Sequence, residues 1–462
     1  MKYIGPFLRI NILDNENIKS QLFYLSKESI AHIVLSSNCG IISPNDHLRN
    51  KILPTNDNSI NHGNSPLLSL YKKADGRLIN ENDKLKWNDK KFKREINIAS
   101  NAYMTLGLLE LADYYSNFID IDDDKYSLKT YYLDLAKEQL EFYALNCRNN
   151  EGVFVDKVDT SEPLLGQYNL HDKENKFKFS NQALLMTAYY KCSTYDKISE
   201  NNQFKNFALD ILNMFEQFKE EIYNVSHDEL VKICFAFNIF YKYSKLDNAL
   251  VLLLDFSELM MENFKHIPIS ALKENLATTC LLYINCMILY KTTGIRKFKD
   301  ESEKAYSLLE NLYQNDNGIF IKDFQEKENK FASDEIILYL CAMMLHYDIE
   351  KEENEDPDNS IIYNIYKNQV IGSGLILSWP EAPTLDDVER YKNFSSKAED
   401  LLQDEFFRMS SMSTPENSEL APIFAKYVTY SNKKQTFKPS KPSFDAYRNM
   451  FIFYVILFLK TL

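Results

Sequence analysis

Acidic residues in the polar stretches of this chain are its best candidates for chemistry. Asp156 and Asp323 each follow a similar short apolar segment, and Glu381 lies two residues after Trp379. A protonated carboxyl group and an ionised one can act on a substrate as general acid and general base. We therefore predict Asp156, Asp323 and Glu381 as catalytic candidates. The alternative is that these acids are simply solvated.

Four further acids stand where predicted helices begin, and they have a structural interpretation of their own. The segment Ser226-His227-Asp228-Glu229 has the pattern of a capping box, in which side chains satisfy the first backbone N–H groups of a helix. Acids are also favoured near the positive end of the helix dipole. We expect capping to explain these four residues, Asp228, Glu229, Asp334 and Glu335.

The only two tryptophans of the chain, Trp87 and Trp379, both fall in long predicted loops. Tryptophan offers a flat apolar face with a polar edge and is common where small ligands bind. We predict both as substrate-binding residues. The competing interpretation is that each tryptophan anchors its loop to the scaffold.

Asparagine recurs at the start of predicted buried helices, at Asn101, Asn181 and Asn275. These amides could hydrogen-bond a polar ligand, or they could satisfy backbone groups of the loops. His171 lies in a long loop and could carry protons near neutral pH, although a lone loop histidine is commonly a bystander. We include all four residues as predicted substrate-binding positions.

The composition indicates a globular protein and excludes several kinds of partner. Hydrophobic residues make up 45% of the 462 residues, charged residues 26%, and the formal net charge is -13. An acidic chain with dispersed lysines argues against nucleic acid, because phosphate binding needs a concentrated basic surface. The apolar run 450–459 is too short to cross a membrane and predicts a buried helix. We expect neither a nucleic acid nor a membrane partner, and the sequence leaves the oligomeric state open.

Cysteine usage and the N-terminal residues indicate a reducing compartment. The seven cysteines form no CxxC pair or other metal-ligand spacing, and most fall inside apolar helical runs. Gly5 and Pro6 interrupt any apolar signal segment near the N-terminus. No glycine-rich phosphate loop, nucleophile elbow or HExxH motif occurs. We expect a cytoplasmic protein without cofactor or metal.

The apolar residues predict twelve helices of two alternating kinds. Six have one polar face and should lie outside, whereas six are apolar on nearly every side and must be enclosed by other helices. The predicted outer helices are 15–37, 128–146, 203–223, 246–264, 296–313 and 360–370, and the inner ones are 98–115, 181–195, 228–243, 276–290, 334–347 and 446–459.

This alternation predicts an all-α (α/α)6 toroid of six helical hairpins, formed by residues 1–462 as one domain. The links from inner to outer helices are mostly short, whereas four links from outer to inner helices are long, 38–97, 148–180, 314–333 and 372–445. Because the helices alternate in direction, all long links should emerge on one face. Loops gathered on a rigid scaffold usually carry the function.

A weak repeat follows the outer helices, in which a glycine precedes two apolar residues at Gly40, Gly152, Gly318 and Gly374. Glycine suits the left-handed conformation that ends a helix, and the apolar pair reads as a short strand. We predict β-hairpins in two of these loops, with 153–155 and 319–321 as their first strands.

The segment Ser100-Asn101-Ala102, the outer helix around Ala136-Lys137 and the segment Gly152-Val153-Phe154-Val155-Asp156 resemble the hairpin unit of the six-hairpin glycosidase-like toroids. That superfamily includes glycoside hydrolases, unsaturated-glycoside hydrolases and sugar epimerases. The resemblance covers most of the chain but rests on architecture, and no motif indicates one family.

The resemblance implies an intracellular enzyme that acts on a small carbohydrate in a funnel on the long-loop face. Glycoside cleavage requires two carboxyl groups on either side of the scissile bond, and the predicted acids would supply them. The alternative is a non-catalytic toroid whose face binds a protein or peptide. Two carboxylates in a cleft would favour the enzyme, whereas a filled centre would favour the binding protein.

Overall fold

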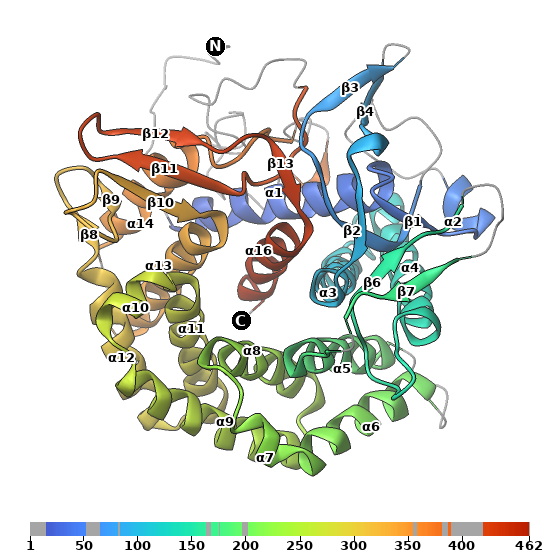
Figure 1. Cartoon of the computed structure of the whole chain (residues 1–462), viewed down its shortest axis with the longest axis horizontal. Helices are drawn as coiled ribbons and strands as arrows, with labels where there is room; N and C mark the ends of the chain where they lie inside the picture. Colours follow the sequence, from blue (N-terminus) through green and yellow to red (C-terminus); the bar gives the residue numbers. More distant parts are fainter. Residues whose placement is uncertain are drawn as a thin grey trace.

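Inner helices form a closed ring at the centre of the molecule (Figure 1). The computed structural model describes residues 15–51, 65–81, 84–162, 168–174, 176–195, 202–353, 358–380, 387–389 and 419–461. Within these residues the ring consists of α3 (Ile98–Ser116), α5 (Phe179–Ser193), α8 (His227–Ser244), α11 (Leu276–Thr293), α13 (Ser333–Glu353) and α16 (Ala446–Leu459). Each of these helices packs against the next, and α16 packs against α3.

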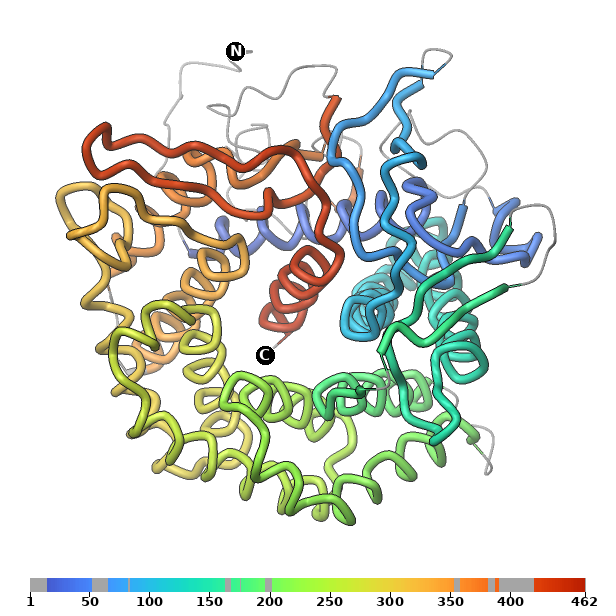
Figure 2. Tube along the Cα trace, in the orientation of Figure 1, coloured from blue at the N-terminus to red at the C-terminus, as the bar shows by residue number. Residues whose placement is uncertain are grey.

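Each inner helix has an outer partner, which completes six hairpins in the described part of the chain. The outer helices are α1 (Asn15–Ser36), α4 (Asp123–Asn146), α6 (Gln203–Gln217), α9 (Asp247–His266), α12 (Arg296–Glu310) and α14 (Ser360–Ile365). Five outer helices follow their partner along the chain, whereas α1 packs against α16 (Figure 2). The predicted (α/α)6 toroid is confirmed.

The inner helices are crowded, as their composition predicts. Gly107 of α3 packs closely against α1, since an added Cβ would lie 3.0 Å from Cδ1 of Ile30. The seven cysteines are all buried with free thiols. Burial raises the pKa of Cys234 and Cys341 to about 12, so these thiols act as small apolar groups.

Two predicted outer helices differ in detail from the structure. The helix expected over 203–223 is interrupted at Phe218, where α6 ends and the short α7 (Lys219–Ile222) begins. The helix expected over 360–370 begins as α14 and continues as a wider π-helical turn, η3 (Tyr366–Ile371). Among the helices of the described residues, none is both long enough and apolar enough to span a membrane.

The links that lead into the inner helices carry all the strands (Figure 1). One sheet has the order β1-β2-β5-β6-β7, with β13 also paired to β2, and a second has the order β10-β11-β12. Their bounds are β1 (Gly40–Ile42), β2 (Leu67–Asp75), β5 (Lys93–Ile96), β6 (Lys157–Asp159), β7 (Leu170–Asp172), β10 (Glu328–Ala332), β11 (Tyr427–Ser431), β12 (Thr436–Pro439) and β13 (Ser443–Asp445). Two small hairpins are β3 (Leu78–Glu81) with β4 (Lys84–Trp87), and β8 (Tyr313–Gln314) with β9 (Ile319–Phe320).

The predicted hairpin strands are only partly correct. Ile319–Phe320 is a strand, but it is the second strand of its hairpin and pairs with β8. The segment 153–155 forms only an isolated bridge at Phe154, and the hairpin of that loop is β6–β7. The reason is a side chain: the amide of Gln182 binds both the N–H and the C=O of Phe154, at 3.0 and 2.8 Å, in place of a partner strand.

The same hydrogen bonding between a side-chain amide and a loop backbone recurs around the ring. Gln369 binds the backbone of Phe320, Asn101 that of Leu70, and Asn449 that of Phe424, in each case through both the N–H and the C=O. Each amide satisfies two backbone groups that would otherwise be buried without partners. The loops are therefore fixed to the helical scaffold at repeated positions.

The glycine repeat has two different causes. Gly152, Gly318 and Gly374 adopt left-handed conformations, with φ of 85°, 61° and 74°, as predicted. In the first repeat Asn38 takes the left-handed conformation instead. Gly40 is required for space, since a Cβ there would lie 1.8 Å from the carbonyl oxygen of Ser69.

Candidate active site at the mouth of the toroid

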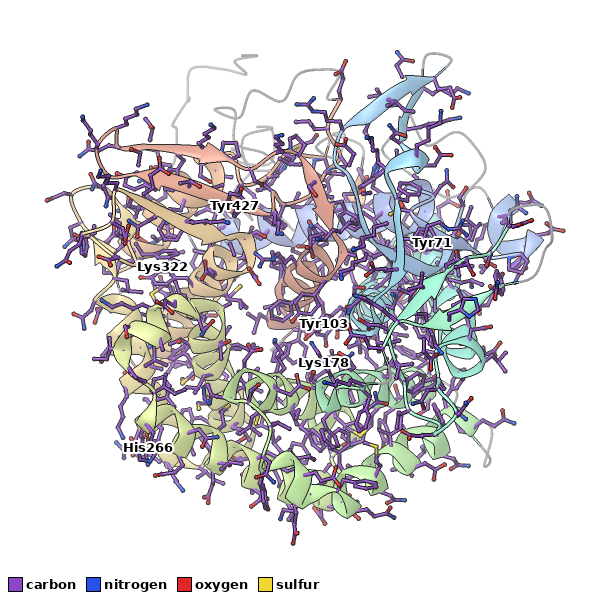
Figure 3. All side chains as sticks on the ribbon, viewed as in Figure 1. Tyr71, Tyr103, Lys178, His266, Lys322 and Tyr427 are labelled. Carbon is purple, nitrogen blue, oxygen red and sulfur yellow. The ribbon has the colours of Figure 1, made fainter. Side chains whose placement is uncertain are left out.

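All six inner helices begin on the face that carries the strands, so their first turns lie together at one end of the ring (Figure 1). We call this region the mouth and define it by Tyr103, Lys178, Asn181, Asp228, Glu229, Lys232, Asp334, Tyr447 and Arg448. In Figure 3, Tyr103 and Lys178 lie toward the centre of the ring, whereas His266 lies at its periphery. The strands overlie α13, α16 and α3, and the opposite half of the ring carries helices alone (Figure 1).

Asp228, in the first turn of α8, is an ionised carboxylate held by two partners. Nζ of Lys232 lies 2.5 Å from its Oδ2, and the hydroxyl of Thr278 on α11 donates to its Oδ1 at 2.7 Å. Burial favours the neutral acid, but the charge of Lys232 and these hydrogen bonds outweigh it and lower the pKa of Asp228. Asp228 is therefore held in its ionised form.

Asp334, in the first turn of α13, has a raised pKa instead. Burial raises the pKa of this carboxyl group, and the nearby guanidinium of Arg448 on α16 only partly offsets the effect. Nη1 of Arg448 lies 3.1 Å from Oδ1 of Asp334, whose side chain is 14% exposed. The carboxyl also faces the first backbone N–H groups of its own helix. Asp334 is therefore suited to hold and donate a proton.

The two neighbouring glutamates have structural roles. Oε1 of Glu229 accepts the backbone N–H of Ser180 at 2.9 Å, so this residue of α8 caps α5. Glu335 forms an ion pair with Lys322 at 2.9 Å and accepts the N–H of Ala332 at 2.8 Å. Capping explains these two acids, and Ser226 caps α8 as the capping box predicts.

Three polar groups of the mouth make no hydrogen bond to the described part of the chain. They are the hydroxyl of Tyr103 on α3, the hydroxyl of Tyr447 on α16 and the amide of Asn181 on α5, which is only 6% exposed. None of these polar atoms is among the fully buried side-chain atoms of the described residues that lack a partner, so each of them is accessible from the mouth. A polar ligand would supply the missing partners.

Tyr447 connects these groups into one site. Its ring lies 6.3 Å from that of Tyr103 and stacks on Phe451 at 5.9 Å with an interplanar angle of 14°. Burial raises the pKa of Tyr447 to about 12; Lys232 opposes this, while Asp334 and Asp228 reinforce it. The Tyr447 hydroxyl is therefore within electrostatic reach of both carboxyl groups.

The predicted catalytic acids lie apart from these groups. Asp156 accepts the side-chain amide of Asn97 at 3.0 Å and the backbone N–H of Ile98 at 2.9 Å, so it caps α3. Asp323 is exposed and accepts the backbone N–H of Gln325 at 2.8 Å. Glu381 lies outside the described residues. Catalytic roles for these three acids remain predictions.

Both predicted tryptophans are buried in contacts with the scaffold. Trp87 is 6% exposed, donates its Nε1–H to Nε2 of His32 on α1 at 3.0 Å and meets Phe444 edge-on at 5.4 Å. Trp379 is 4% exposed. This burial matches the interpretation in which tryptophans anchor the loops.

The remaining predicted binding residues are divided between the mouth and other positions. Asn101 is occupied by the backbone of Leu70, while Asn275 and His171 are exposed at the start of α11 and on β7. Asn181 alone of these residues lies in the mouth without a partner. Among the described residues, no group of three or more His, Cys, Asp or Glu is arranged to hold a metal.

The sequence did not single out five residues of the mouth, Tyr103, Lys178, Lys232, Tyr447 and Arg448. With 30 tyrosines in the chain, a tyrosine inside an apolar helix is indistinguishable from core filling. Their position within the first two turns of inner helices is the one signal that the sequence contains.

Known proteins resemble this chain in overall fold only. No protein-family model and no curated protein matches the chain. Among solved structures, D-mannose isomerase is 10% identical, with 85% of this chain and 92% of that chain covered and a TM-score of 0.49.

Two further solved structures have similar values. Cellobiose 2-epimerase from Bacillus thermoamylovorans is 8% identical, with 84% and 92% of the two chains covered and a TM-score of 0.49. The C. cellulolyticium cellulase in complex with cellobiose is 10% identical, with 97% and 99% covered and a TM-score of 0.44. The chain has the six-hairpin toroid fold that its sequence resemblance implies, and this conclusion rests on the closed ring of hairpins itself.

Proposed function

We propose that the mouth is the active site of an enzyme that acts on a small carbohydrate by proton transfer. The observation that carries this proposal is the pair of oppositely tuned carboxyl groups, Asp334 and Asp228, both within electrostatic reach of Tyr447. Carboxyl groups whose environments move their pKa values apart can take the roles of acid and base.

The chemistry follows from the surroundings of each group. Burial raises the pKa of Asp334, which favours its acid form, and in that form it would donate a proton to a leaving or ring oxygen. Asp228 stays ionised beside Lys232 and would accept a proton from water or from a sugar carbon or hydroxyl. The free hydroxyls of Tyr103 and Tyr447 and the amide of Asn181 would hydrogen-bond the sugar hydroxyls.

A second candidate function is a toroid that binds a protein or peptide without catalysis. It is favoured by the aromatic filling of the ring below the mouth, where Phe451 and Tyr454 pack against Tyr103 with ring centroids 5.2 and 5.6 Å apart. A cavity of about 570 Å³ lies instead on the outer surface, between α9 and α12.

A thermal-shift screen against neutral and charged sugars distinguishes the two functions. We expect at least one carbohydrate to raise the melting temperature, and Asp228→Asn and Asp334→Asn to abolish turnover of that carbohydrate. Asp156→Asn serves as the comparison, because it tests the acid predicted from sequence at a position that caps α3. The absence of stabilisation by every carbohydrate would support the binding protein.

A further inference from the structure

The links around one half of the mouth are strongly basic, although the chain as a whole is acidic. Within the described residues, the segments 65–81 and 84–97 contain nine Lys or Arg against four Asp or Glu, and 419–445 contains five Lys against two acids. The whole chain has 53 basic and 66 acidic residues. These segments lead into α3 and α16, the helices that carry Tyr103 and Tyr447.

Within the mouth itself, most charges are paired. Asp228 is paired with Lys232, Asp334 with Arg448, and Glu229 accepts an N–H group of α5. Lys178 is the cation of the mouth that has no ion-pair partner among the described residues. A cation without a partner favours an anion over a neutral ligand.

Lys178 is the cation that an anion can reach. It is exposed and immediately precedes α5, and its side chain forms no ion pair or hydrogen bond with any described residue. Its charge helps to lower the pKa of Asp228, which places its ammonium group on the side of α5 that faces α8. Figure 3 shows it toward the centre of the ring.

Asn181 lies three residues after Lys178, in the first turn of the same helix. Its amide is buried and has no partner, and the backbone at the start of α5 has no side-chain cap of its own. An ammonium group and an amide N–H at the start of a helix form a set of donors suited to a carboxylate or phosphate.

We propose that the substrate is an anionic sugar, whose carboxylate or phosphate group is bound by Lys178 and Asn181. This inference rests on the proposed function and specifies its substrate class. The sugar ring then lies beside Tyr447, within electrostatic reach of Asp228 and Asp334. Basic segments beside α3 and α16 attract the anion from solution, so that its association weakens as the salt concentration rises.

The test is isothermal titration of the full chain with four matched ligands: glucose, glucuronate, glucose 6-phosphate and inorganic phosphate. We expect one or both of the anionic sugars to bind at least about tenfold more tightly than glucose, because a charge-assisted hydrogen bond replaces a neutral one. The comparison between glucuronate and glucose 6-phosphate identifies the anion.

Two variants locate the site. Lys178→Gln should weaken binding of the anionic sugar about tenfold and leave glucose unchanged, and Asn181→Ala should weaken it less. Lys265→Gln, which removes a lysine paired with Glu262 on the outer helix α9, should have no effect. A variant Lys178→Gln that binds the anionic sugar as tightly as the parent protein would overturn the proposal.

The other outcomes separate this inference from the proposed function. If glucose and the anionic sugars bind equally, the mouth is a carbohydrate site and the inference about charge is wrong. If inorganic phosphate binds in a Lys178-dependent manner but no sugar does, the anion site stands and the carbohydrate function is wrong. Binding of none of the four ligands would contradict both.

Discussion

The two ends of the ring differ in how their polar and charged groups are paired. At the end opposite to the mouth, Lys191 of α5 is 1% exposed, contacts Glu110 and Asp113 of α3 at 2.7 and 3.1 Å and donates to the hydroxyl of Tyr243 on α8 at 3.0 Å. The Tyr243 hydroxyl donates to Glu110 at 2.5 Å. All of these groups are satisfied within the protein, whereas the mouth leaves hydroxyl and amide groups without partners.

A second closed network lies at the same end, between α1, α3 and α4. Glu389 is 1% exposed and lies 2.8 Å from Nζ of both Lys27 and Lys125, and the hydroxyl of Tyr114 donates to it at 2.9 Å. Complete pairing of buried charges is what structural stability requires. The charged groups of this end are thus paired within the protein, although the hydroxyl of Tyr454, close to Glu110, is buried without a partner.

The largest expected effect is the loss of the Lys191 network. Glu110→Ala removes the main partner of a fully buried ammonium group and should lower the free energy of unfolding by about 3–5 kcal/mol. Asp228→Asn at the mouth, where the ion pair is partly exposed, should cost less than about 1 kcal/mol. Urea unfolding of both variants measures the difference. Equal losses would remove the distinction between the two ends.

The next effect concerns activity. Asp334→Asn should lower kcat/KM about 10²- to 10⁴-fold on the carbohydrate selected by the thermal-shift screen, because the amide cannot donate the acid's proton. The variant should remain as stable as the parent, since burial already disfavours the charge. Asp323→Asn, on an exposed loop of the same face, is the control. A greater loss of kcat/KM with Asp323→Asn would support the catalytic role predicted for Asp323 from the sequence.

The Glu389 network should be visible in acid unfolding. The charges of Lys27 and Lys125 outweigh burial and lower the pKa of Glu389 from 4.5 to about 2. Since the folded-state pKa lies below the unfolded-state value, its stabilisation of roughly 3 kcal/mol is complete above about pH 4.5 and disappears as the pH falls toward 2.

Glu389→Gln tests this assignment. The variant should be less stable than the parent at pH 7, and the two stabilities should converge toward pH 2, as followed by urea unfolding at a series of pH values. A constant difference across that range would show that the carboxylate contributes through packing and not through its charge.

The smallest effect comes from a matched pair of tyrosines. Tyr243→Phe breaks a buried hydrogen-bond network and should cost about 1–3 kcal/mol. Tyr103→Phe removes a hydroxyl that has no partner and should change stability by less than about 0.5 kcal/mol, while it weakens ligand binding. Thermal unfolding of both variants measures the contrast. A large loss of stability with Tyr103→Phe would indicate that this hydroxyl of the mouth has a structural role.

The fold was predictable because its signal is periodic. Amphipathic and wholly apolar helices alternate along the sequence, and burial on all sides leaves the apolar ones no place except the centre. The error over 153–155 arose because Gln182, a residue outside that segment, binds the backbone of Phe154. Because the group that pairs with Phe154 is a side chain and not a strand, the sequence of 153–155 gives no sign that a partner strand is missing.

The site was less predictable because its defining property is the absence of partners. From sequence, Asn101 and Asn181 are equivalent, yet one binds Leu70 and the other binds nothing within the described chain. Asp228 and Asp334 were considered only as caps, since their pKa values depend on Lys232 and Arg448 and on burial that the sequence does not display.

The pairing of α1 with α16 has a consequence for the order in which the molecule is made. Lys460 contacts Ser20, 440 residues earlier in the chain, so the apolar face of α1 must wait through most of synthesis for its partner. Because α16 also carries Tyr447 and Arg448, the event that closes the ring is the one that completes the mouth. Ligand binding would therefore report ring closure, and a nascent chain stalled before α16 should be both open and unable to bind.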